Sequence, residues 1–103
     1  MLFRSAKRAP VAPEIPTVAE SGFPGFEFDV WYGMVFPGGT PRPIVMKANG
    51  EIVKLLKTPA VRDRFVAGGL EPASSTPEEF RDIIRHEIPI WHKVAKQANI
   101  KVE

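Results

Sequence analysis

The chain has 103 residues, of which 44% are hydrophobic and 25% are charged, so it lies in the globular range and allows one small domain at most. Its formal net charge is +2, and because basic residues alternate with acids along the chain, no dense basic stripe predicts a nucleic-acid partner. The absence of cysteine excludes disulfides and thiolate metal sites, and no apolar run approaches the ~20 residues that a membrane-spanning helix needs.

Residues 1–25 have the pattern of a connector rather than of a helix or strand. The basic residues near the start are not followed by an apolar stretch, so we expect no signal peptide in this chain. Pro10-Val-Ala-Pro13 and Pro16 predict an extended path. The sequence Thr17-Val-Ala-Glu20 has the capping-box pattern and predicts a single capped turn, which Gly22 closes.

The run from Phe26 to Phe36 is the most informative segment of the chain. At period two it places apolar residues on one face, whereas the other face begins with Glu27 and Asp29 and becomes apolar from Trp31 onward. A strand that is apolar on both faces belongs inside a sheet covered by helices. The chain offers few partner strands, so the pattern indicates that these residues are part of a larger fold.

Three Thr-Pro pairs divide the second half of the chain, and each predicts a helix that begins with a threonine cap and a proline in the first turn. The first helix follows Thr40-Pro41 and extends to about Lys57, although Asn49-Gly50 lies in its middle. A shorter helix follows Thr58-Pro59 and stops at Gly68-Gly69. Residues 70–74 are a candidate short strand.

The third helix, which follows Thr76-Pro77, has the strongest signal. Thr76 and Glu79 match a capping box, and an apolar stripe continues from Phe80 to Ala98. Pro89 interrupts this stripe, so we expect a kink near residues 85–89 rather than two separate helices. The predicted order of elements is therefore connector, strand, helix, helix, strand, helix.

The sequence contains no convincing catalytic or metal site. His86 and His92 are six residues apart and fall on separate sides of a helix, so their spacing does not match a zinc-binding helix. Asp82 and His86 are one turn apart, but this helix supplies no serine nucleophile, and a solvated surface pair is the better interpretation. We therefore expect no catalytic residue, no metal and no cofactor.

Trp31, Tyr32 and Asp29 are the candidate ligand-cleft or hinge residues. The polarity of the predicted strand changes at Trp31, as expected where a strand passes from one environment into another. Packing under the first helix is the simpler role for such aromatic rings, whereas lining a cleft for a small molecule is the alternative.

An ordered set of motifs resembles a known family. The motifs are Pro16-Thr-Val-Ala-Glu20, Gly22-Phe-Pro-Gly-Phe26, Trp31-Tyr-Gly33, Pro37-Gly-Gly-Thr-Pro41, Thr76-Pro-Glu-Glu-Phe80 and Trp91-His-Lys-Val94. In this order and spacing they resemble the C-terminal third of the solute-binding proteins of tripartite tricarboxylate transporters, the Bug receptors. The resemblance covers nearly everything after about Ala6.

The resemblance implies an incomplete α/β fold, part of a two-lobed periplasmic-binding-protein type II receptor. Residues 1–25 would end the second lobe, residues 26–36 would form the crossover strand of the hinge, and residues 37–103 would complete the first lobe. The full-length parent would be periplasmic, would bind a small carboxylate and would deliver it to the membrane permease subunits of the transporter. The loops that grip the carboxylate would come from parts of the family's chain that precede this region.

A second hypothesis comes from the exposed strand edges that a truncated sheet would have. On this hypothesis the chain is a self-associating or partner-binding α/β interaction module without a transport role.

Overall fold

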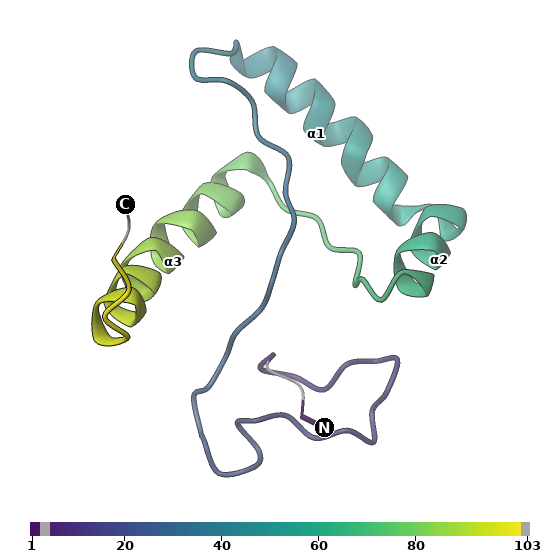
Figure 1. The fold of residues 1–103 in the computed structure, drawn as a ribbon. Coiled ribbons are helices and arrows are strands. Elements are labelled where there is room, and N and C mark those ends of the chain that lie inside the picture. The colour runs from purple at the N-terminus through teal and green to yellow at the C-terminus, as the bar shows by residue number, and fades with distance from the viewer. Residues whose placement is uncertain (3–4, 102–103) are drawn as a thin grey trace. The chain divides into compact units, whose positions relative to one another are not determined.

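The computed structural model describes residues 1–2 and 5–101. The helices of this part of the chain are, in order, α1 (Arg42–Lys57), α2 (Pro59–Ala67) and α3 (Pro77–Gln97), as Figure 1 shows. The chain divides into two compact units, Met1–Val35 and Phe36–Glu103. All three helices belong to the second unit, within which α1 contacts both α2 and α3.

The described part of the first unit consists of turns and an extended stretch. The predicted capped turn at Thr17–Glu20 is confirmed, because the Glu20 amide donates to Thr17 Oγ1 at 3.2 Å and the Thr17 amide donates to Glu20 Oε2 at 2.9 Å. Gly22 follows with a φ of 111°, a backbone conformation that side-chain-bearing residues rarely adopt. The chain then continues without helix into the segment 26–36 (Figure 1).

A helix follows each of the three Thr-Pro pairs, as predicted, but only Thr76 of the three acts as a side-chain cap, and in α1 the N-cap position is occupied by Pro41 rather than by Thr40. Thr76 Oγ1 accepts from the Glu79 amide at 3.1 Å, and the Glu79 carboxylate accepts from the Thr76 amide at 3.0 Å, which completes the capping box of α3. The prediction of threonine caps on α1 and α2 is wrong. The hydroxyls of Thr40 and Thr58 instead donate backward to the carbonyls of Pro37 and Leu55, because a hydroxyl can satisfy the preceding turn as well as the following helix.

The ends of α2 and α3 have the same geometry. Gly69 and Asn99 both have a positive φ, 76° and 55° respectively, just after the helix. The Leu70 amide donates to the Phe65 carbonyl, and the Ile100 amide donates to the Ala95 carbonyl, each at 2.9 Å and each five residues back along the chain. This is the Schellman arrangement, and it confirms the predicted stop at Gly68-Gly69.

Helix α3 passes through Pro89 as a single element, which confirms the prediction of one helix rather than two. The kink expected near residues 85–89 stays a prediction. The side chain of Pro89 is exposed.

The two predicted strands, residues 26–36 and 70–74, do not form strands in this chain. Neither has strand secondary structure, and no β-strand occurs within residues 1–2 and 5–101. The physical reason is that a strand needs a neighbouring backbone to pair with, and an apolar pattern alone does not supply one.

No apolar side chain is fully buried in the described part of the chain, where the buried residue is Thr17, at 1% exposure. Large apolar side chains are instead exposed on the segment 26–36 and on α3: Phe26, Val30, Trp31, Tyr32, Met34, Val35 and Phe36 on the segment, and Ile83, Ile88, Ile90, Trp91 and Val94 on the helix. Exposed apolar surface of this extent is the mark of a surface that other elements cover. None of the helices described here combines the length and the apolar content that a bilayer crossing requires.

Candidate functional site

The three predicted site residues lie on the extended segment 26–36. Tyr32 is 82% exposed, Trp31 is 41% exposed and Asp29 is also exposed. Neither aromatic ring is enclosed by this chain as a ligand-binding ring would be. Their role in lining a cleft or hinge stays a prediction.

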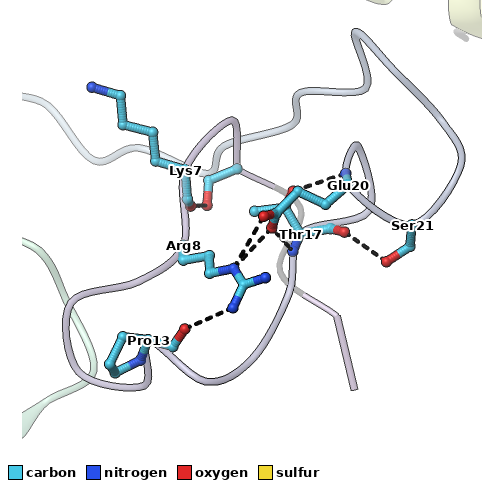
Figure 2. Close-up of polar contacts among 7 residues, drawn as sticks. Lys7, Arg8, Pro13, Thr17, Glu20 and Ser21 are labelled. Carbon is cyan, nitrogen blue, oxygen red and sulfur yellow. Dashed lines mark hydrogen bonds and ion pairs between the residues drawn. The ribbon is translucent and has the colours of Figure 1, made fainter.

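A cluster of polar contacts in the first unit joins residues 12 positions apart (Figure 2). Arg8 Nε donates to both carboxylate oxygens of Glu20, at 3.2 and 3.0 Å, and Arg8 Nη1 donates to the Pro13 carbonyl at 3.1 Å. Glu20 also takes part in the capped turn with Thr17, and the Ser21 hydroxyl donates to the Thr17 carbonyl at 2.9 Å. One carboxylate therefore connects the start of this loop to its end.

The contacts of Glu20 lower the pKa of its carboxyl group. The pKa of its carboxyl is lowered to about 2, first because Arg8 donates to it and then because the Thr17 amide does so. The carboxylate is consequently ionised at any pH near neutrality, and its acceptor positions are directed into the loop.

In the second unit, an open groove of about 300 Å³ lies beside α1 and the start of α3. Asn49 and Ser75 both line it, and Asn49 Nδ2 donates to the Ser75 carbonyl at 2.9 Å. The hydroxyl of Thr76 and the carboxylate of Glu79 also line it, but both take part in the capping box. The lining residues are Asn49, Gly50, Val53, Ser74, Ser75, Thr76 and Glu79. The groove therefore presents polar groups that already serve the structure.

An ion pair joins the beginnings of α1 and α3. Arg42 Nη2 lies 2.6 Å from Glu78 Oε1, and both side chains are largely exposed. The pKa of Glu78 is lowered, chiefly because Arg42 donates to its carboxylate. Together with the Asn49 contact, this pair attaches α3 to α1 through polar groups rather than through a buried apolar interface.

Within residues 1–2 and 5–101, no group of three or more His, Asp or Glu side chains is close enough to hold a metal ion. His86 and His92 are both exposed on α3. The structure therefore brings together no set of side chains around either histidine that would bind zinc.

The long-range polar contacts are the features that sequence reasoning missed. Arg8 and Glu20 are separated by a loop without periodicity, and Asn49 looked only like a weak residue for a helix. In the structure the side chain of Asn49 donates to the Ser75 carbonyl and so fixes the segment before α3 to α1. The capping-box pattern at Thr17 and Glu20 was the one signal in the sequence that indicated a carboxylate turned toward the backbone.

Comparison with known proteins finds a family whose members match nearly the whole chain. A family model described as the tripartite tricarboxylate transporter family receptor matches residues 2–100. A UPF0065 protein in the tcbD-tcbE intergenic region of Pseudomonas sp. (strain P51) is 40% identical over 91 residues, which are 87% of this chain and 27% of that protein. Protein BugT of Bordetella pertussis is 33% identical over 99 residues, which are 96% of this chain and 30% of BugT.

Two solved structures have a similar fold. The structure of R. palustris Rpa4515 with adipate is 34% identical with a TM-score of 0.78, over 93% of this chain and 32% of that one. The periplasmic binding protein BugD is 33% identical with a TM-score of 0.79, over 97% of this chain and 34% of that one. The predicted α/β fold of the periplasmic-binding-protein type, present in part, is thus confirmed. The chain spans about a third of the length of these relatives.

Proposed function

Because the chain belongs to the tripartite tricarboxylate transporter receptor family, we propose that it forms the C-terminal third of a periplasmic receptor that binds a small carboxylate and delivers it to the transporter's membrane permease. The match over residues 2–100 is the observation that carries this proposal. Binding and release by such a receptor neither make nor break a covalent bond, so the protein is not an enzyme. Adipate is the first ligand to test, because the 34% identical Rpa4515 was solved with it.

The receptor's lobes are assigned to this chain as follows. Residues 1–25 end the second lobe, residues 26–36 cross between the lobes, and residues 37–103 complete the first lobe. The boundary between the two compact units, between Val35 and Phe36 at the end of the crossing segment, supports the separation of residues 37–103 from the part before them. Trp31, Tyr32 and Asp29 lie on the same segment and contact the ligand or the hinge in the complete receptor.

The exposed apolar side chains have a role in this assignment. The aromatic residues of the segment 26–36 and the stripe on α3 form the surfaces that the rest of the receptor covers. Isolated, the chain has neither that cover nor the opposite wall of a cleft. We therefore expect it to bind carboxylates weakly or not at all by itself.

A chimeric receptor tests the proposal. Residues 2–100 replace the matching third of Rpa4515, and adipate binding is measured by isothermal titration calorimetry alongside unmodified Rpa4515. The expected result is a folded chimera that binds adipate. A chimera that melts cooperatively, and hence is folded, yet shows no heat of binding with adipate or with other small carboxylates would overturn the proposed role.

Matched variants of the chimera examine the cleft residues. Replacing Tyr32 by Phe removes one hydroxyl, and replacing Trp31 by Ala removes a large ring, and both are expected to weaken binding if these residues contact the ligand. Tyr32→Phe should be the milder change. Ile100→Ala is the control, because this exposed residue lies outside the segment 26–36.

The hypothesis of an interaction module is favoured by the same exposed apolar surface, since such a surface also fits a second copy of the chain. Sedimentation of the isolated chain distinguishes the two. A discrete dimer that melts cooperatively supports the module, whereas a loosely folded monomer or polydisperse aggregate supports the receptor.

A further inference from the structure

The loop of residues 8–21 has a closed arrangement of side-chain contacts that the transport role does not explain. The Glu20 carboxylate accepts from Arg8 Nε with both oxygens and from the Thr17 amide with Oε2. The amide of Glu20 in turn donates to the hydroxyl of Thr17. The two turn residues therefore hold each other, and Arg8 attaches the beginning of the loop to Glu20 (Figure 2).

Side-chain contacts join the parts of this loop. Among the described residues, the loop backbone has turns, in which the Ala12 amide donates to the Ala9 carbonyl at 3.0 Å and the Ile15 amide donates to the Ala12 carbonyl at 3.1 Å, and it has an isolated bridge at Thr17. Arg8 Nη1 adds a contact to the Pro13 carbonyl in the middle of the loop. Thr17, at the centre of the contacts, is 1% exposed.

The exit of the loop is fixed by the same residues. The hydroxyl of Ser21 donates to the Thr17 carbonyl at 2.9 Å, and its amide donates to the Val18 carbonyl at 3.1 Å. Gly22 then turns the chain with its positive φ. The backbone that leads from this turn toward Phe26 thus starts from a held position.

We propose that Arg8, Thr17 and Glu20 form a clasp, a closed set of polar contacts that holds residues 8–21 and sets how the chain enters the segment 26–36. Arg8 and Glu20 are positioning residues in this clasp and act through the turn at Thr17. The clasp is a property of the first unit alone, so it goes beyond the proposed transport role and does not depend on a ligand.

The charge of Glu20 closes the clasp. Arg8 is the charged side chain that faces its carboxylate within the described residues, and a guanidinium keeps its proton at every relevant pH. A carboxyl whose pKa is depressed in the folded state contributes above its ordinary pKa and loses that contribution as the pH falls toward the depressed value. The clasp therefore stays closed from neutrality down to about pH 4 and opens as the pH approaches about 2.

Nuclear magnetic resonance of the full chain tests the clasp in two ways. In the unaltered protein the Glu20 carboxyl should titrate near pH 2, and Arg8→Gln should move this midpoint upward toward the ordinary value for glutamate, about 4.3. Lys7→Gln removes a charge of the same sign from the adjacent, exposed position and should leave the midpoint near its original value. A Glu20 carboxyl that titrates at its ordinary value in the unaltered chain overturns the clasp, and this result requires no variant.

The second test measures hydrogen exchange of the Thr17 amide, which donates to the Glu20 carboxylate. Glu20→Gln should speed this exchange roughly two- to fivefold, as expected for an exposed charged contact. Glu14→Gln makes the same change at an exposed position of the same loop and should leave the exchange rate unaltered. Equal rates in Glu20→Gln and Glu14→Gln would contradict the proposed clasp, and unchanged exchange in α3 shows that the second unit is intact in each variant.

Discussion

Replacing Pro89 by alanine should lengthen the lifetime of the C-terminal half of α3. Proline has no amide hydrogen, so in the interior of a helix it leaves the carbonyl four residues earlier without its donor, and its ring clashes with that turn. Helix α3 nevertheless continues from Pro77 to Gln97 through this position. The helix therefore retains a residue that disfavours helical structure, and the side chain of Pro89 is exposed, so its replacement should remove little packing.

The magnitude follows from the cost of proline relative to alanine in a helix interior, which is about 3 kcal/mol. Since the ring is exposed and its loss should remove little packing, most of this difference should appear as added helix stability. A gain of that size slows amide exchange by local helix opening on the order of 100-fold. The assay is hydrogen exchange of the amides from Ile90 to Gln97, with helical ellipticity at 222 nm as a second measure.

Pro77→Ala is the matched control within the same helix. Pro77 occupies the first turn of α3, where its missing amide hydrogen has no helical partner to lose and its fixed φ suits the helix. This substitution should therefore change exchange in α3 little. The reasoning is refuted if Pro89→Ala leaves the exchange of Ile90–Gln97 unchanged, or if Pro77→Ala slows it as much.

Three further predictions concern the second unit. Thr76→Ala should destabilise the start of α3 by about 1 kcal/mol, because the helix loses its side-chain cap, and the Glu79 amide should then exchange faster. Thr76→Ser keeps a hydroxyl and should retain most of the protection. Equal exchange of the Glu79 amide in both variants would contradict the cap. Gly50→Ala should stabilise α1 by about 1 kcal/mol, because alanine favours the helix and, beyond the adjoining residues and backbone of α1 itself, no described atom lies within 4 Å of the added carbon. Urea unfolding followed by ellipticity measures this change. A loss of helicity would contradict the prediction. Arg42→Gln should raise the pKa of Glu78 toward the ordinary value for glutamate. The ionised carboxylate stabilises the fold above that ordinary pKa and loses this contribution as the pH falls, so the contribution should be smaller in the variant. A Glu78 titration, followed by its carbon-13 resonance, that does not move in the variant would show that the ion pair does not form in solution.

The helices could be predicted from the sequence because their signals are local. A threonine or a proline at a helix start, and Gly68-Gly69 at a helix end, act within one turn of the chain. Which way a threonine hydroxyl turns is decided by competing carbonyls on either side, so the pattern predicted where helices begin but not that only Thr76 would cap.

The sequence could not predict whether the two strands form, because a strand pairs with a backbone segment that can lie far away in the sequence or in another part of the protein. The alternation in the segment 26–36 correctly indicated a stretch that needs neighbours on both sides, and the structure leaves its large side chains exposed. The pattern carries no information on whether those neighbours are present. The same limit applies to the candidate site, since Trp31 and Tyr32 can be assigned to a cleft only when the opposite wall is known.

The polar contacts between distant residues were outside the reach of sequence reasoning. Nothing in the spacing of Arg8 and Glu20, or of Asn49 and Ser75, follows a helical or strand period. These contacts depend on the paths of the loops between the two residues. Each joins residues within one unit, and the described part of the chain has no buried apolar core.

Hydrogen exchange over the segment 26–36, compared between the isolated chain and the Rpa4515 chimera, tests the central claim most directly. The amides of Glu27, Val30 and residues 32–36 should exchange at nearly the rate of an unstructured peptide in the isolated chain and should be strongly protected in the folded chimera, where a covered sheet pairs them. Protection of these amides in the isolated monomer, or rapid exchange in the folded chimera, would contradict the account.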